Sequence, residues 1–123
     1  MTARPLHDRR ILAVEDEYYL AMDLAAELTG AGADVIGPAP SIEQALSLIT
    51  AEPRIDAAVL DINLGGEMAF PVADALLARG VPFVFTTGYI DSDSDARYAQ
   101  VPRCEKPLEF RKLLETLREL PLR

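Results

Sequence analysis

The sequence has little cysteine, no long apolar run and no cluster of basic residues, and each absence excludes a class of protein. Its single cysteine, Cys104, excludes an internal disulfide and a thiolate metal cluster. No apolar stretch approaches the roughly 18 residues of a membrane helix, and the N-terminus lacks the form of a signal peptide. Its 20 acidic residues outnumber 12 basic ones, which form no stripe suited to a phosphate backbone. We therefore expect a cytoplasmic protein that contacts neither a membrane nor nucleic acid directly.

What is present predicts one α/β domain over residues 1–123. Short apolar runs alternate with segments of helical period, and these runs end near Asp16, Gly37, Asp61, Thr87 and Lys106. The spacing of 19 to 26 residues leaves room for one strand, one helix and two loops in each interval. We therefore predict a doubly wound fold, with a five-stranded parallel sheet and five helices. The second strand is expected to be brief, at residues 35–36, and the fourth helix short, because residues 90–100 are polar and weakly periodic.

Polar side chains follow four of the predicted strands. They are Glu15, Asp16, Asp61, Thr86, Thr87 and Lys106. Ligands of open α/β sheets bind outside the carboxyl ends of the strands, so these groups are expected to meet. Clustered carboxylates repel one another unless a cation lies among them, and oxygen ligands favour Mg²⁺. A lysine and a threonine hydroxyl suit phosphoryl oxygens, and Asp61 could attack phosphorus to form an aspartyl phosphate.

The order of these residues resembles the receiver domain of response regulators in bacterial two-component signalling, over nearly the whole chain. The motifs that carry the resemblance are VEDE with Glu15 and Asp16, VLDINLG with Asp61, FTTGY with Thr87, and EKPLEF with Lys106 and Pro107. The resemblance implies a flavodoxin-like strand order of 2-1-3-4-5, a phospho-acceptor at Asp61 and a cis peptide before Pro107.

The resemblance also implies individual roles. Asp16 and Asp61 would bind Mg²⁺ directly, the backbone carbonyl of Asn63 would complete the protein ligands, and Glu15 would act directly or through a water. Thr87 and Lys106 would contact the phosphoryl group. The implied partners are a histidine kinase or histidine phosphotransfer protein as donor and a downstream protein as target.

Two departures from the family pattern affect the expected switch. Arg103 occupies the position, three residues before the lysine, where the family usually has an aromatic residue, and Glu15 stands where aspartate is commoner. The stretch FTTGY instead resembles a subgroup with a Phe-x-Thr-Gly-Tyr signature, often found as stand-alone domains. We therefore expect Tyr89 and residues 91–100 to form the switching surface. The predicted fourth helix, fifth strand and fifth helix would then meet the partner.

Structural roles are expected for the remaining polar and aromatic residues of interest. Thr86 and Cys104 are assigned to the core, and His7 to the solvated N-terminal segment. At least one of Tyr18 and Tyr19 is expected to pack against the fold.

Three alternative functions are weighed against the phospho-receiver. A phosphatase with a strand-end aspartate nucleophile would need a second aspartate two positions on, where this chain has Asn63. We therefore expect self-phosphorylation and self-dephosphorylation only, without turnover of external substrates. A receiver-like binding module is disfavoured because every phosphorylation residue is present. The chain as a receiver fragment of a larger response regulator or hybrid kinase remains open.

Overall fold

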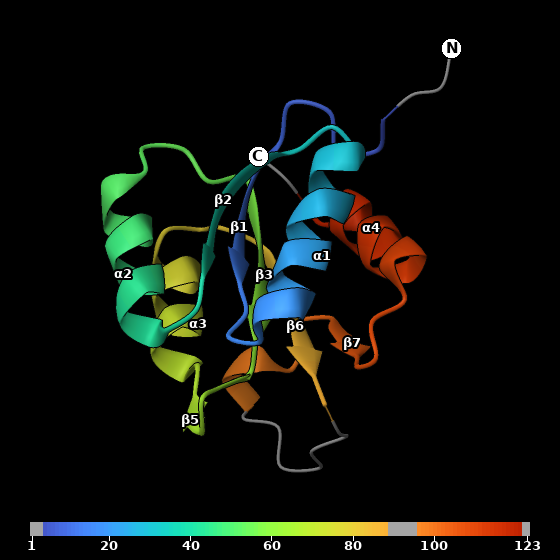
Figure 1. Cartoon of the computed structure of the whole chain (residues 1–123). Helices are drawn as coiled ribbons and strands as arrows, with labels where there is room; N and C mark the ends of the chain where they lie inside the picture. Colours follow the sequence, from blue (N-terminus) through green and yellow to red (C-terminus); the bar gives the residue numbers. More distant parts are fainter. Residues whose placement is uncertain (1–3, 89–95, 122–123) are drawn as a thin grey trace.

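The computed structural model describes residues 4–88 and 96–121, and its main feature is a five-stranded parallel sheet (Figure 1). The strands are β1 (Arg10–Val14), β2 (Asp34–Ala39), β3 (Ala57–Asp61), β6 (Phe83–Thr87) and β7 (Arg103–Glu105). Their order across the sheet is β2-β1-β3-β6-β7, and every neighbouring pair is parallel. The predicted doubly wound fold and its strand order are confirmed.

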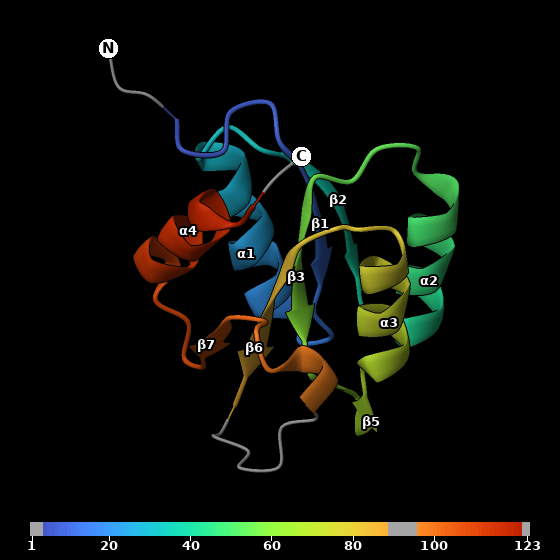
Figure 2. The same cartoon turned by 180° about the vertical axis from the view of Figure 1, so that it is seen from behind.

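Helices cover both faces of the sheet. Figures 1 and 2 show α1 (Tyr18–Gly30) and α4 (Phe110–Glu119) on one face, with α2 (Ile42–Ala51) and α3 (Phe70–Ala78) on the other. Each pair buries its apolar side chains against the sheet, so two core clusters form, one on each face. All five residues of β3 and of β6 are buried, as expected for central strands of a sheet covered on both sides.

The described residues contain four α-helices where five helices were predicted. Residues Ala96–Tyr98 form a single 3₁₀ turn, η1, and residues 89–95 lie outside the described part of the chain. Short 3₁₀ turns are common connectors, and this segment lacks the apolar stripe that would stabilise a longer helix. Within the described ranges, none of the helices has both the length and the apolar character that crossing a bilayer requires.

Strand β2 is longer than predicted. It spans Asp34–Ala39, whereas the sequence predicts a strand at residues 35–36 that ends near Gly37. The strand lies at the edge of the sheet and pairs only with β1. An edge strand tolerates proline because its outer N–H groups make no ladder hydrogen bond. A Gly-Pro pair therefore does not terminate a strand in this position.

A short antiparallel hairpin follows β3. It consists of β4 (Asn63–Leu64) and β5 (Glu67–Met68), joined by Gly65 and Gly66. Both glycines have positive φ angles, of 59° and 92°, which side chains disfavour and hairpin turns require. The N–H of Ala69 donates to the carbonyl of Ile62 at 2.7 Å and closes the hairpin at its base. The sequence predicts no paired strands here, because two-residue strands are too short to show a periodic pattern.

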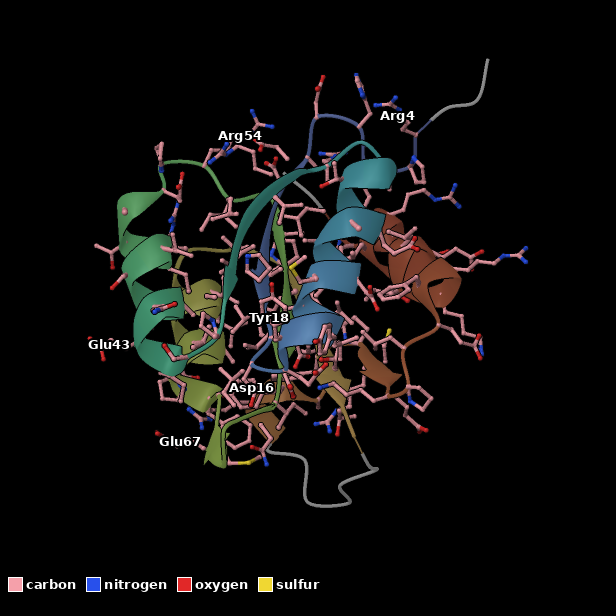
Figure 3. The ribbon with its side chains drawn as sticks, viewed as in Figure 1. Arg4, Asp16, Tyr18, Glu43, Arg54 and Glu67 are labelled. Atoms are coloured by element: carbon pink, nitrogen blue, oxygen red, sulfur yellow. The ribbon has the colours of Figure 1, made fainter. Side chains whose placement is uncertain are left out.

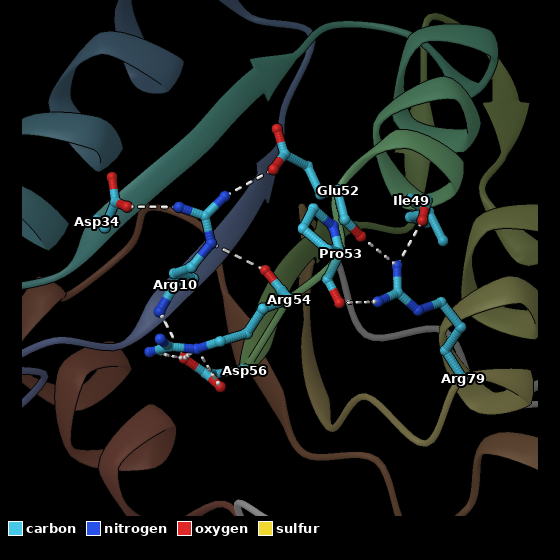
Figure 4. A network of polar contacts seen from close by, with 8 residues as sticks. All are labelled: Arg10, Asp34, Ile49, Glu52, Pro53, Arg54, Asp56 and Arg79. Atoms are coloured by element: carbon cyan, nitrogen blue, oxygen red, sulfur yellow. Dashed lines mark hydrogen bonds and ion pairs between the residues drawn. The ribbon is translucent and has the colours of Figure 1, made fainter.

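Arg10 connects neighbouring segments at the end of the sheet where the strands begin. Arg10, at the start of β1, donates from its guanidinium to the carbonyl of Arg54 and to the carboxylates of Asp34 and Glu52, at 2.9, 2.6 and 2.6 Å (Figure 4). Its backbone N–H donates to Asp56 at 2.8 Å. In Figure 3, Arg54 lies at the end of the sheet away from Asp16 and Glu67. Ionic and backbone contacts therefore stabilise the end of the sheet where the strands begin.

Asp56 should make the stability of this end of the sheet depend on pH. Burial acts to raise the pKa of its carboxyl, but hydrogen bonds from Arg54 and from the Arg10 N–H outweigh burial and lower it below its ordinary value of 3.8. A lowered carboxyl pKa stabilises the folded state above the ordinary pKa, and this contribution disappears as the pH falls through the folded-state value. Asp56→Asn should therefore cost on the order of 1 kcal/mol at neutral pH. The difference from the parent protein should shrink below about pH 4 in urea unfolding, and a difference that is constant with pH would contradict the assignment.

Candidate functional site

Three carboxylates meet at the carboxyl end of the sheet. Glu15 and Asp16 directly follow β1, and Asp61 is the last residue of β3. β1 and β3 are neighbours, so the chain crosses from one half of the sheet to the other at this point. One oxygen from each carboxylate lies within 4.8 Å of the others. The structure brings together the three acidic residues that we predicted as metal ligands.

Lys106 faces two of these carboxylates. Its Nζ lies 2.7 Å from Asp61 Oδ2 and 2.9 Å from Glu15 Oε1. The residue follows β7, and its backbone N–H donates to the carbonyl of Thr87 at 2.7 Å. The peptide bond between Lys106 and Pro107 is cis, as predicted. Burial acts to lower the pKa of Lys106, but the contacts with Asp61 and Glu15 outweigh burial and raise it, so the ammonium remains charged at neutral pH.

Glu15 and Asp16 have different surroundings although they are adjacent. Glu15 is only 2% exposed and accepts hydrogen bonds from Lys106 and from the Glu17 N–H. Burial raises the pKa of Glu15, opposed by these two hydrogen bonds. Asp16 is exposed, and its Oδ2 accepts from the N–H of Gly65 at 2.9 Å. Asp16 is therefore the carboxylate that a solvated cation reaches most directly.

Asp61 is buried and held from two sides. One carboxylate oxygen accepts from the Asn63 N–H at 3.0 Å, and the other contacts Lys106. Asp61 is therefore oriented both by the hairpin and by Lys106. The ligand role of the Asn63 backbone carbonyl stays a prediction.

Thr87 ends β6, beside the carboxylates. Its neighbour Thr86 is paired with Asp61 across the sheet, is 1% exposed and accepts the Ile62 N–H at its backbone carbonyl. Thr86 therefore has a structural environment, as predicted. Thr87 is 6% exposed and lies one residue closer to the carboxyl end of the strand. All six residues predicted at the strand ends thus gather at one edge of the sheet.

The prediction that Tyr18 or Tyr19 packs against the fold is wrong. Their exposed fractions are 66% and 74%, and the two rings contact each other edge to face with centroids 5.3 Å apart. They open α1, where the carboxylate of Glu17 caps the helix by accepting from the backbone N–H groups of Tyr19 and Leu20. The first turn of a helix that starts beside a loop can project away from the core, which helical periodicity alone does not show. His7 is exposed, as predicted, while Cys104 is half-buried.

Arg103 and Tyr98 both contact the ring of Phe85 in β6. The Arg103 guanidinium carbon lies 5.6 Å from the centre of the Phe85 ring, and the Tyr98 ring meets the same Phe85 ring edge to face. Tyr98 is 1% exposed and stacks on Phe70. The polar sequence around Tyr98 gives no sign that this tyrosine is buried. Tyr89 and residues 91–95 lie outside the described residues, so the predicted switching surface remains a prediction.

No family model matches the chain. Individual known proteins are similar to it. Over 81 residues it is 37% identical to the phyllosphere-induced regulator PhyR of Methylorubrum extorquens, a match that covers 64% of this chain but only 30% of the length of PhyR.

Solved structures extend the likeness to the whole fold. The structure of SdrG from Sphingomonas melonis Fr1 is 40% identical, with a TM-score of 0.75, and the match covers 95% of this chain and 98% of SdrG. A response regulator receiver protein from Sinorhizobium medicae shares the fold, with a TM-score of 0.75 at 24% identity, over 91% of this chain and 93% of that one. On this full-length likeness, together with the strand order and the acidic edge of the sheet, the chain belongs to the response-regulator receiver domains.

Proposed function

We propose that the chain takes a phosphoryl group from a phosphohistidine onto Asp61, with Mg²⁺ as cofactor, and signals by contact with another protein. The observation that carries the proposal is the placement of Asp61. It is a buried carboxylate at a strand end, within hydrogen-bonding distance of one lysine and within 4.8 Å of two further carboxylates. A purely structural carboxylate would not need two acidic neighbours, whose charges oppose its own.

The donor set fits Mg²⁺. Three carboxylates supply hard oxygen atoms within 4.8 Å of one another, while one ammonium group, Lys106, faces two of them. Mg²⁺ prefers such oxygens and keeps several waters, which suits an edge where Asp16 is open to solvent. Asp16, Asp61 and the carbonyl of Asn63 would hold the ion, with Glu15 beside them. When bound, Mg²⁺ would offset the negative charge of the phosphoryl oxygens.

The residues of the chain can perform the transfer. A carboxylate oxygen of Asp61 would attack phosphorus, and the bond from phosphorus to the histidine nitrogen would break, with its electron pair returning to the ring. Lys106, already beside Asp61, would neutralise charge on a phosphoryl oxygen, and the Thr87 hydroxyl would donate a hydrogen bond to another. Each group acts on a different part of the transferred phosphoryl group.

A phosphatase acting on external substrates is less well supported. The residue two positions after Asp61 is Asn63, whose side-chain oxygen accepts the Gly66 N–H at 2.8 Å and cannot act as a general acid. We therefore propose a phosphate-accepting signalling protein whose only chemistry is its own phosphorylation and dephosphorylation. A histidine kinase or a histidine phosphotransfer protein is the proposed donor.

The proposal is supported by one relative in particular. A second structure of SdrG, 39% identical to this chain, is described as the BeF3-activated conformation. Beryllofluoride is a phosphoryl mimic, so that protein adopts an activated form with a mimic of the group proposed here. The likeness supports, for this chain, a site that accepts a phosphoryl group.

Removal of Mg²⁺ tests the proposal. With a small-molecule phosphodonor and Mg²⁺, the intact protein should gain one phosphoryl group by mass spectrometry, and EDTA should abolish this gain. Asp16→Ala should weaken Mg²⁺ binding more than Glu15→Gln, because Glu15 is buried and engaged by Lys106 whereas Asp16 is exposed. A protein that gains no phosphoryl group with Mg²⁺, or gains it equally in EDTA, would contradict the proposal.

A further inference from the structure

The hairpin formed by β4 and β5 orients two of the three carboxylates. The N–H of Asn63 donates to Asp61 Oδ1 at 3.0 Å, and the N–H of Gly65 donates to Asp16 Oδ2 at 2.9 Å. The two donors are two residues apart on one short element, while their acceptors follow different strands. The conformation of the hairpin therefore determines how the two carboxylates are oriented relative to each other.

Of the three carboxylates, Asp16 depends most on its hydrogen bond from the hairpin. Glu15 and Asp61 are buried and both contact Lys106, so their side chains are restrained by packing and by charge. Asp16 is exposed, and an exposed carboxylate exchanges freely among rotamers unless a partner restrains it. The Gly65 N–H supplies such a partner and leaves the second oxygen of Asp16 for another contact.

The side chain of Asn63 closes the turn that carries this N–H. Its Oδ1 accepts from the N–H of Gly66, the second glycine of the turn, at 2.8 Å. Glycines at positive φ have wide conformational freedom, so a local hydrogen bond has a large effect on where their N–H groups point. Leu64, directly before the turn, is buried, whereas Gly65 and Gly66 are exposed, so the N–H groups of the turn depend on this local hydrogen bond.

We propose that the Asn63 side chain is a positioning residue for the metal site: it closes the β4–β5 turn, which aims the Gly65 N–H at Asp16 and fixes that carboxylate for the cation. The inference rests on the proposed Mg²⁺-dependent function and adds a role for the amide side chain, distinct from that of the Asn63 backbone carbonyl. The exposed position of Asn63 fits this role, because the side chain is not needed to fill the core.

Calorimetric titration with Mg²⁺ of the full, unphosphorylated chain tests the inference. Asn63→Ala removes the acceptor of the Gly66 N–H and should weaken Mg²⁺ binding about tenfold, the lower end of the effect seen when partners of metal ligands are removed. The free energy of unfolding in EDTA should fall by no more than about 1 kcal/mol, because the side chain is exposed and only one hydrogen bond is lost. Asn63→Ser should recover most of the affinity, because a serine hydroxyl can accept the same turn hydrogen bond and adds no charge.

A pair of glycine variants provides a matched comparison. Gly66→Ala places a side chain at a φ of 92°, where only backbone strain results because no atom lies within 4 Å of the added carbon. It should weaken Mg²⁺ binding as Asn63→Ala does. Gly30→Ala also adds a carbon in open space, but at the end of α1, and should leave the affinity unchanged.

The outcomes separate the inference from the function on which it rests. If the parent protein binds Mg²⁺ and Asn63→Ala binds it within about twofold as well, the positioning role is wrong and the proposed function stands. If Asn63→Ser loses as much affinity as Asn63→Ala, closure of the turn is not the cause and the inference is overturned. If the parent protein itself binds no Mg²⁺, the proposed function fails first.

Discussion

Asp61→Asn is expected to abolish uptake of a phosphoryl group from a small phosphodonor in the presence of Mg²⁺. An amide has nearly the same shape as a carboxylate, so the Asn63 N–H can still donate to the side-chain oxygen and Lys106 can still contact Glu15. The neutral amide, however, lacks the nucleophilic charge that attack on phosphorus requires. Mass spectrometry of the intact chain and of its peptides should show one phosphoryl group on the parent protein and none on the variant.

Asp23→Asn is the matched control for this experiment. Asp23 lies on an exposed face of α1, so the variant loses the same charge away from the carboxylate cluster. It should be labelled as fully as the parent protein. Labelling of Asp61→Asn to the parent level would show that another residue accepts the phosphoryl group.

Arg10→Met is expected to lower the free energy of unfolding by about 2–3 kcal/mol. Methionine keeps the apolar part of the side chain but removes the guanidinium group, which donates to the carbonyl of Arg54 and to the carboxylate of Glu52. The Arg10 side chain is 26% exposed and that of Glu52 is 29% exposed, so these contacts are screened less than surface pairs. The contact with Asp34, which is 64% exposed, should contribute little.

Urea unfolding measures this effect, and Arg111→Met provides the control. The Arg111 side chain is 92% exposed and lies 3.8 Å from Glu115 one helical turn away, so its loss should change stability by less than about 0.5 kcal/mol. The dependence on urea concentration should be the same in all three proteins, because the surface exposed on unfolding hardly changes. Equal effects of the two substitutions would show that the Arg10 contacts add no more than a surface charge does.

The cluster of carboxylates at the carboxyl end of the sheet could be predicted from the sequence, because parallel strands bring their carboxyl ends together. Once Asp16, Asp61 and Lys106 were each assigned to a strand end, their proximity followed from the topology alone. The family resemblance gave the order of the strands and the cis peptide before Pro107, both of which the structure has. Neither could be derived from apolar periodicity.

Other features could not be predicted because they depend on contacts between distant residues. The extent of β2 through Pro38 depends on its place at the edge of the sheet. The burial of Tyr98 depends on the rings of Phe70 and Phe85, which come from other elements. The hydrogen bond from Gly65 to Asp16 joins residues 49 positions apart. Local patterns contain no record of such partners.

The contacts of Arg10 at the start of β1 contribute to the stability of the fold independently of the residues at the carboxyl end of the sheet. Arg10 begins the strand and Glu15 follows its end, so five residues of extended chain, about 16 Å, separate them. Substitutions this far apart, with no shared partner, usually have additive effects on stability. Residues around Asp61 can therefore be exchanged while the stabilisation supplied at Arg10 stays the same. A strengthened arginine end would equally offset the loss of stability from a harmful substitution at the acidic end.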